Sequence, residues 1–483
     1  MRSLVTLSLS LLALAGPANA RTLGSISFTP CELSGTGSAL VKAECARFDV
    51  PENPDAGGRS ITLQLALIPA RAPRPEHDIV VMLAGGPGQA ATEAFPDVAP
   101  AFETLRKNRH ILLIDQRGTG KSNPLKCALP DWSDPATTAP AALRAQAQRC
   151  LDAARKHSDP RWYTTTDAVR DLETVRQSMG GPRLNLLGVS YGTRVALEYL
   201  RRHPHAVRSA VLDAVVPPEL ALPGDHAANL DDALARIFAA CRAAPDCAQR
   251  FGDPARTLDK LRAQLALRPV AATLQDPRTH VPLRQPLTLE LLAGVVRLYA
   301  YQPETAALLP LLLDEAAQGR AGPLVGQAEL IYKRLGDSLA HGMELSVICT
   351  EDAPFLRPNP NEQGRLLGAQ LGELTREQCA VWPRGTLPAD FKLPVSADAP
   401  VLLLSGELDP VTPPRYAEQV ARTLPRSRAL VLKGQGHSAI IRGCVPRLVR
   451  QFIDAADAAA LDPSCLDPLA AMPAFTSFQG PPP

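Results

Sequence analysis

Short apolar runs recur along this 483-residue chain, and each ends in a turn rich in glycine or polar residues. Runs that are apolar throughout are typical of strands buried on both faces of a parallel sheet. The stretches between them, such as residues 167–179 and 194–202, have the spacing of amphipathic helices. The apolar runs occupy residues 79–83, 110–114, 184–187, 210–212, 400–404 and 429–432. The pattern predicts an α/β fold whose mostly parallel sheet carries helices on both faces.

The strand pattern stops between residues 217 and 399. This region lacks convincing apolar strands and instead shows helical patterns, for example over residues 254–267 and 306–318. We therefore expect a large, mostly helical cap inserted into a catalytic core that is built from two parts of the chain. The expected boundaries are 21–217 for the first part of the core, 218–399 for the cap and 400–483 for the second part.

The first 20 residues have the features of a secretory signal peptide. Arg2 gives a positive start, residues 4–15 are apolar, and Ala18-Asn19-Ala20 matches a cleavage site. The apolar run is too short to span a bilayer, so no membrane anchor is expected in the mature form. The sequence predicts an exported protein, either periplasmic or extracellular.

All ten cysteines lie after this segment, which favours disulfide bonds in an oxidising compartment. A metal cluster is the rival interpretation, but the chain has no C-x-x-C pair. Neighbouring cysteines form five short-range couples. The expected pairs are Cys31–Cys45, Cys127–Cys150, Cys241–Cys247, Cys349–Cys379 and Cys444–Cys465.

Charge and composition change the picture little. A formal net charge of +2 gives no reason to expect nucleic acid as a partner, and nothing indicates a metal or organic cofactor. The oligomeric state is left open. Residues 473–483 are rich in proline and glycine, a composition typical of a disordered end.

The candidate nucleophile is Ser190. It stands in Gly188-Val189-Ser190-Tyr191-Gly192, between an apolar run and a helical pattern. A strand-to-helix turn of this kind holds a serine at an exposed apex, and its glycines allow strand and helix to approach closely. Because a serine hydroxyl is a weak nucleophile, it needs a base, an acid and oxyanion donors.

Asp409 and His437 follow the last two apolar runs, which completes the chain order Ser, Asp, His of an α/β-hydrolase triad. His437 would take the Ser190 proton, and Asp409 would orient the imidazole. Two other carboxylates compete for the role of acid. Asp213 also ends an apolar run, and Glu407 is a weaker candidate.

The oxyanion hole is expected to combine the Tyr191 N–H with an N–H of the first glycine-rich loop. Gly86 is the preferred donor of that loop, ahead of Gly85 and Gly88. The loop lacks the lysine of a phosphate-binding P-loop. The turn at residues 115–120 is expected to brace the site through Arg117 and not to act in catalysis.

These motifs together resemble secreted α/β-hydrolase-fold serine peptidases, namely prolyl iminopeptidases and tripeptidyl aminopeptidases. The resemblance rests on Gly-Gly-Pro-Gly at 85–88, Asp-Gln-Arg-Gly-Thr-Gly-Lys-Ser at 115–122 and Gly-Val-Ser-Tyr-Gly at 188–192. Residues 406–413 and 436–437 add to it, and the C-terminal part with Trp382 and the last cysteines is similar to the tripeptidyl-aminopeptidase type. One departure is Ala84, where the family commonly has histidine.

The resemblance implies hydrolysis of peptides from a free N-terminus, under the helical cap. A free ammonium group needs a carboxylate partner, and Glu351 and Asp352, just after Cys349, are the candidates for it.

The sequence thus predicts a serine aminopeptidase that releases amino acids or short peptides through an acyl-enzyme on Ser190. The alternative is a carboxylesterase or amidase that acts on small esters or amides with the same triad. A binding protein that has lost catalysis is a third class, which the complete set Ser190, Asp409 and His437 disfavours.

Overall fold

The computed structural model describes residues 20–35, 37, 39–130, 134–276, 279–357, 359–362 and 364–481. The expected signal peptide lies outside these residues except for Ala20. None of the helices in the described ranges combines the length and the apolar character that crossing a membrane requires.

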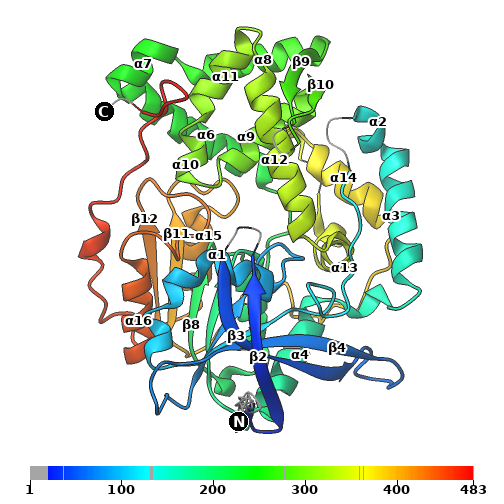
Figure 1. Cartoon of the computed structure of the whole chain (residues 1–483), viewed down its shortest axis with the longest axis vertical. Helices are drawn as coiled ribbons and strands as arrows, with labels where there is room; N and C mark the ends of the chain where they lie inside the picture. The colour runs from blue at the N-terminus through cyan, green and yellow to red at the C-terminus, as the bar shows by residue number, and fades with distance from the viewer. Residues whose placement is uncertain are drawn as a thin grey trace, which may run out of the picture.

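A ten-stranded sheet forms the centre of the core (Figure 1). Its order is β1-β2-β3-β4-β6-β5-β7-β8-β11-β12, and the six strands from β6 to β12 are parallel. The first four strands pair antiparallel at one edge, β4 on β6 included. The strands are β1 Arg21–Leu23, β2 Ile26–Ser34, β3 Leu40–Pro51, β4 Ser60–Ile68, β5 Ile79–Leu83, β6 Ile111–Ile114, β7 Leu184–Val189, β8 Val207–Asp213, β11 Val401–Gly406 and β12 Ser427–Leu432.

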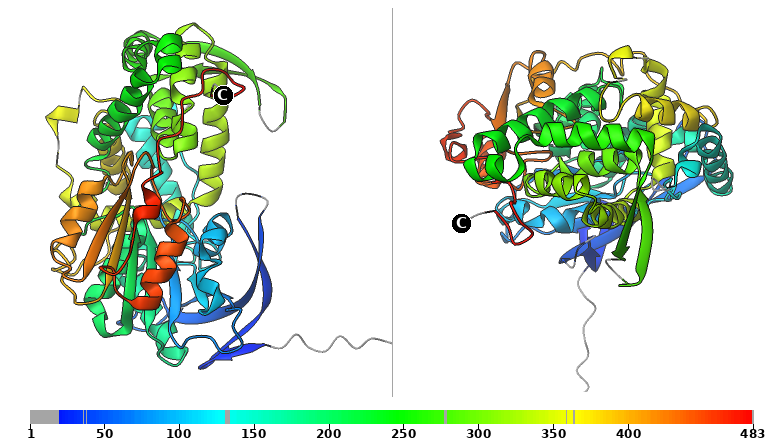
Figure 2. Two further views of the ribbon diagram at one scale, coloured as in Figure 1. Left: turned by 90° about the vertical axis from the view of Figure 1, so that its left-hand side faces the viewer. Right: turned by 90° about the horizontal axis from the view of Figure 1, so that it is seen from above.

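Helices cover both faces of this sheet, as the apolar runs predict (Figure 2). Leu186 of β7 points to one face and Leu187 to the other, since side chains alternate along a strand. One face packs against α4 (Thr165–Ser178), α5 (Tyr191–Arg202) and α15 (Pro414–Ala421). The opposite face packs against α1 (Ala91–Phe102) and α16 (Val445–Ala455).

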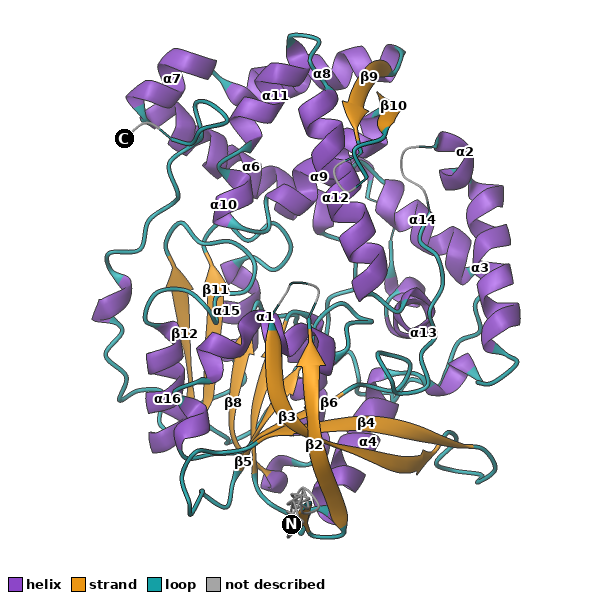
Figure 3. Cartoon of the chain, viewed as in Figure 1, coloured by secondary structure: helices purple, strands orange, loops and turns teal. Residues whose placement is uncertain are grey.

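The chain between β8 and β11 is mostly helical and has a hydrophobic core of its own (Figure 3). Its helices are α6 His226–Ala243, α7 Pro245–Phe251, α8 Pro254–Leu267, α9 Leu289–Tyr299, α10 Pro303–Ala306, α11 Leu309–Ala317, α12 Gly322–Ser338, α13 His341–Glu351 and α14 Gln370–Cys379. It also contains a hairpin of β9 (Val270–Gln275) and β10 (Pro282–Leu287), which the sequence analysis did not predict. Its strands bury only alternate residues, so they lack an apolar run.

The remaining helices, α2 (Pro135–Thr138) and α3 (Pro140–Ala154), lie beside α14. The five disulfide bonds join the same five neighbouring pairs that the sequence predicts. Residues 473–481 do not behave as a disordered end. Ala474 and Phe475 pack against the Cys241–Cys247 bond, and the Phe475 N–H donates to the Ala307 carbonyl at 2.9 Å.

Candidate active site

Ser190 occupies a sharp turn between β7 and α5. Its backbone has φ +56° and ψ −125°, a combination that is rare for residues other than glycine and that stores local strain. A Cβ on Gly192 would lie 2.1 Å from the Leu83 carbonyl oxygen, and one on Gly188 would lie 2.4 Å from that of Gly192. Only glycine therefore fits at both positions, and the turn presents Ser190 at the carboxyl end of β7.

Asp409 and His437 lie in contact at the carboxyl ends of β11 and β12. The His437 Nδ1 is 2.8 Å from the Asp409 Oδ2, and both residues are buried. Asp409 is itself fixed by three donors, the Val411 and Thr412 N–H groups and the Thr412 hydroxyl, each at 2.8 Å. The Thr412 Oγ1 also lies 3.3 Å from the His437 Nδ1. This arrangement leaves the His437 Nε2 as the ring nitrogen available to a serine hydroxyl.

The two partners shift each other's pKa. Burial alone would lower the pKa of His437, but the Asp409 charge and hydrogen bond, with the Asp213 charge, raise it above 6.5. Burial alone would raise the pKa of Asp409, but the His437 contact and the Thr412 and Val411 N–H groups lower it. Asp409 is therefore ionised, and it stabilises an imidazolium on His437.

Asp213 stands between the nucleophile turn and the histidine loop. It pairs in register with Val189 of β7 and Leu404 of β11. Its carbonyl oxygen accepts the Ser190 N–H at 2.9 Å. Its carboxylate accepts hydrogen bonds from three groups just after His437. These donors are the N–H groups of Ala439 and Ile440, both at 2.8 Å, and the Ser438 hydroxyl at 3.2 Å. The carboxylate against the His437 ring is thus that of Asp409, while Asp213 positions the loop.

The glycine-rich loop after β5 lies directly beside Ser190. A Cβ on Gly85 would be 3.2 Å from the Ser190 Cβ. Gly86 is exposed with φ +108°, and Tyr191 is the first residue of α5, where a helix leaves its N–H groups without internal partners. The loop also contacts the cap, because the Ala340 N–H donates to the Gly88 carbonyl at 2.9 Å. The loop and the start of α5 therefore lie together at the nucleophile turn, where the sequence predicts the oxyanion donors.

The cap holds the histidine loop from the other side. The His437 N–H donates to the Tyr301 carbonyl at 2.7 Å, and the Gln302 side chain donates to the His437 carbonyl at 3.0 Å. The Tyr301 and His437 rings meet edge to face, with centroids 5.0 Å apart. No local pattern in the sequence predicts these contacts, since Tyr301 and Gln302 lie more than 130 residues from His437. Thr412 could have been found as a hydroxyl three residues after Asp409.

Glu351 and Asp352 lie inside the protein with internal partners. Asp352 binds Arg194 at 3.0 Å and Lys392 at 2.9 Å, and Glu351 accepts the Thr165 N–H at 2.7 Å. Both acidic side chains are fully buried. Burial raises the pKa of Glu351 to about 7, partly offset by Arg194. This arrangement does not support the expected contact with a substrate amine, because both carboxylates are buried against protein partners.

The other predicted elements brace the site. Arg117 forms two hydrogen bonds of 2.7 Å with Asp171 and also bonds the Trp162 carbonyl, which fits its expected architectural role. Glu407, the weaker candidate for the acid, accepts the Gly434 N–H at 2.9 Å. It therefore supports the turn before His437 and does not touch the ring.

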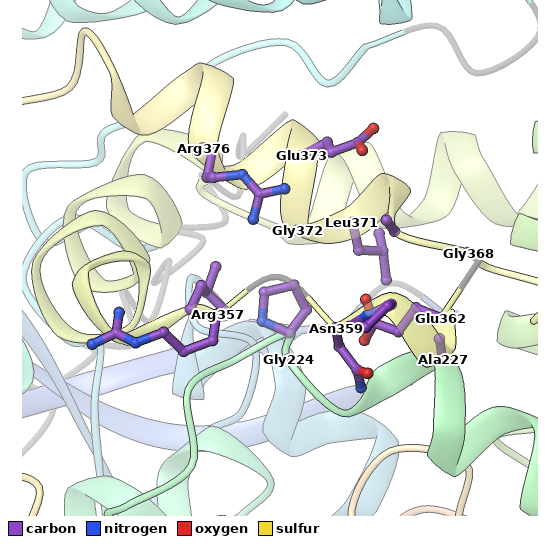
Figure 4. Close-up of a pocket in the computed structure, with 14 residues that line it drawn as sticks. Gly224, Ala227, Arg357, Asn359, Glu362, Gly368, Leu371, Gly372, Glu373 and Arg376 are labelled. Carbon is purple, nitrogen blue, oxygen red and sulfur yellow. The ribbon is translucent and has the colours of Figure 1, made fainter.

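A cavity of about 370 Å³ lies beside the start of α6 (Figure 4). Gly224, Ala227, Arg357, Glu373 and Arg376 are among the residues that line it. An adjoining cavity of about 530 Å³ shares Gly224 and Arg357 with it. Ser190, Asp409 and His437 line neither, so these cavities are separate from the triad.

Comparison with known sequences agrees with the fold. The family of the alpha/beta hydrolase fold matches residues 78–443, so this chain belongs to the α/β hydrolases. The chain is 26% identical over 485 residues to "Serine protease Hip1" of Mycobacterium tuberculosis, covering 89% of this chain and 88% of that protein. It is 30% identical over 244 residues to "Tripeptidyl aminopeptidase" of Streptomyces lividans, covering 45% of each.

Among solved structures, proline iminopeptidase of Mycobacterium smegmatis aligns with 86% of this chain and all of its own length, at 19% identity and a TM-score of 0.41. The matching family and the named relatives make this protein an α/β-hydrolase-fold serine hydrolase similar to serine peptidases.

Proposed function

We propose that this protein is an exported serine aminopeptidase that removes amino acids or short peptides from free N-termini. The observation that carries the proposal is the Asp409–His437 pair beside a serine turn, in a chain similar over 89% of its length to a serine protease. Five disulfide bonds fit an oxidising compartment and so support export.

The proposed chemistry gives each of these residues one role. The Ser190 Oγ attacks the carbonyl carbon of the scissile bond while His437 Nε2 takes its proton. The developing oxyanion accepts hydrogen bonds from the N–H groups of Tyr191 and Gly86. His437 then donates the proton to the leaving amine, and the C–N bond breaks to give an ester on Ser190. Water, deprotonated by His437, hydrolyses the ester and releases the N-terminal fragment.

We propose Glu344 as the carboxylate that binds the substrate amine, in place of Glu351 and Asp352. Glu344 lies in the first turn of α13, four residues after Ala340, which contacts the glycine-rich loop. Its side chain is 25% exposed. Burial raises the pKa of Tyr301, whose ring packs on His437, and the charges of Asp409 and Glu344 add to this rise while Arg297 opposes it. It is thus an accessible carboxylate near the triad, held at 2.7 Å by the His341 ring.

Two fluorogenic substrate pairs test the function, an aminoacyl amide and a tripeptidyl amide, each with a free or an acetylated N-terminus. We expect turnover of the free forms only and no turnover by Ser190→Ala. Glu344→Gln should raise KM for the free substrates by about tenfold, since a charge-assisted contact is lost. The exposed Glu418→Gln is the matched control and should keep the wild-type KM. Hydrolysis of simple esters alone would instead assign a carboxylesterase.

A further inference from the structure

One arginine of the cap reaches the triad region from α9. The guanidinium carbon of Arg297 lies 5.7 Å from the centre of the Tyr301 ring, and that ring lies 5.0 Å from the His437 ring. The positive charge of Arg297 also acts on His437, where it opposes the rise in pKa that Asp409 causes. Arg297 is therefore a cation in the roof of the active site.

Arg297 is only partly buried, and unlike the buried arginines of the core it pairs with no carboxylate among the described residues. Arg117 pairs with Asp171, and Arg194 pairs with Asp352. Among the residues that the structure describes, no carboxylate forms a salt bridge with Arg297, and its buried Nε has no hydrogen-bond partner. A buried N–H donor normally has a hydrogen-bond acceptor, because desolvation of the donor without one is costly. An unpaired guanidinium beside a catalytic centre points to a partner that arrives with the substrate.

His226, at the start of α6, offers a second buried group without a hydrogen-bond partner. The residue is only 8% exposed, and its Nδ1 is buried without a hydrogen-bond partner. Burial, and then the charges of Arg297 and His437, lower its pKa well below 6.5, while Asp409 acts in the opposite sense. His226 is therefore neutral at neutral pH, and it lies within electrostatic reach of both Arg297 and the triad.

We propose that Arg297 and His226 form a subsite for a substrate carboxylate next to the scissile bond. The inference rests on the proposed peptidase function, whose site it extends. A carboxylate supplies both missing elements, a negative charge for the guanidinium and lone pairs for the Arg297 Nε–H and an imidazole N–H. The carboxylate is either an acidic side chain of the peptide or the C-terminus of a short peptide.

Direct binding to the Ser190→Ala protein tests the subsite without hydrolysis. Isothermal titration calorimetry compares Ala-Ala-Glu amide with Ala-Ala-Gln amide, and Ala-Ala-Ala with its C-terminal amide. We expect the charged member of at least one pair to bind about tenfold more tightly or better. A preference in the first pair assigns an acidic side chain, and one in the second pair assigns the terminal carboxylate.

Variants in the same background connect the preference to Arg297. Arg297→Gln should remove the difference within the pair, whereas Arg297→Lys should keep part of it, because a lysine retains the charge but not the planar fork. The control is Arg242→Gln, which removes a surface arginine paired with Asp253 and should leave the preference intact.

Equal affinities within both pairs, the absence of binding, or a preference that survives Arg297→Gln would overturn the subsite. Failure of the peptidase proposal has a different signature, since free and acetylated amides would then both resist the wild-type enzyme whatever the calorimetry shows.

Discussion

The carbonyl oxygen of Asp213 accepts the Ser190 N–H at 2.9 Å, and this contact ties the nucleophile turn to the residue that also holds the histidine loop. The Asp213 carboxylate binds the backbone N–H groups of Ala439 and Ile440, directly after His437. Two segments far apart in the sequence are therefore aligned by one residue at the end of β8, through its carbonyl on one side and its carboxylate on the other. We infer that Asp213 is a positioning residue whose charge also acts on the catalytic base.

The pH dependence of kcat/KM should reflect this charge. Because Asp409 and Asp213 raise the pKa of His437, the base loses its proton above pH 6.5, and kcat/KM should rise with pH to a midpoint above that value. Asp213→Asn removes one of these charges and should move the midpoint to lower pH while it also lowers kcat. A pH–rate profile of both proteins checks this. A lower kcat with an unmoved midpoint would reduce Asp213 to a purely structural role.

Thr412 should act on the rate through Asp409. Thr412→Val removes the hydroxyl that donates to Asp409 at 2.8 Å but keeps the shape of the side chain. We expect kcat to fall about 10- to 100-fold with little change in KM, because the Asp409–His437 pair loses part of its orientation. Steady-state kinetics measure this effect. The control is Thr174→Val, since the Thr174 hydroxyl bonds only a carbonyl on an exposed part of α4; an equal loss there would contradict the account.

The buried ion pairs that Asp352 forms with Arg194 and Lys392 should govern stability and not substrate binding. Asp352→Asn leaves Lys392 without its salt-bridge partner and Arg194 with only the more distant Glu351, at 3.7 Å, and should cost about 3–5 kcal/mol of unfolding free energy in urea. Glu351→Gln should cost much less at pH 6, where a pKa of about 7 leaves the Glu351 carboxyl mostly protonated. KM for free peptides should stay unchanged in Glu351→Gln. A large rise in KM would restore Glu351 as the amine ligand.

The raised pKa of Glu351 also makes the free energy of unfolding fall as the pH rises. Its pKa is higher in the folded protein, about 7, than the 4.5 of an exposed glutamate. Its favourable contribution is therefore complete below pH 4.5 and is lost as the pH rises through about 7. Relative to the wild type, Glu351→Gln should gain stability across this window, which denaturation at pH 5 and pH 8 would show. The opposite trend would contradict the buried, partly protonated carboxyl.

The close approach of β5 to α5 should make Gly192 indispensable. Gly192→Ala places a methyl group 2.1 Å from the Leu83 carbonyl oxygen, so the turn must open and Ser190 must move. We expect a loss of at least about 1–3 kcal/mol in stability, together with loss of activity. The matched control is Gly336→Ala in α12, which meets nothing within 4 Å and should be neutral or stabilise by up to about 1 kcal/mol. Thermal unfolding and turnover of both variants check the contrast.

The sequence predicts the parallel part of the sheet and the order of Ser190, Asp409 and His437 because each rests on a local pattern. Apolar runs identify strands, and motifs place polar residues at their ends. The family match confirms the α/β-hydrolase fold. The hairpin of β9 and β10 and the edge strands β1 and β2 escape prediction, since they bury alternate residues and lack continuous apolar runs.

The contacts made by the cap were also beyond sequence analysis. Tyr301, Gln302 and Arg297 belong to helices and turns that look like ordinary core elements, and only folding brings them to His437. Likewise Glu351 and Asp352 carry the charge that an amine site needs, but their burial against Arg194 and Lys392 depends on how α13 packs on α5. Residue type indicates possible chemistry, whereas accessibility and partners are tertiary properties.

The central claim is that Ser190 forms an acyl-enzyme with the N-terminal part of a peptide. The most direct measurement is intact-protein mass spectrometry after rapid acid quenching of the enzyme with a tripeptidyl p-nitrophenyl ester that has a free N-terminus. We predict a mass increase equal to one tripeptidyl group, located on Ser190 by peptide mapping, and absent when the substrate is acetylated or the enzyme carries Ser190→Ala. Peptide hydrolysis that persists in Ser190→Ala, or an acyl group on another residue, would contradict the account.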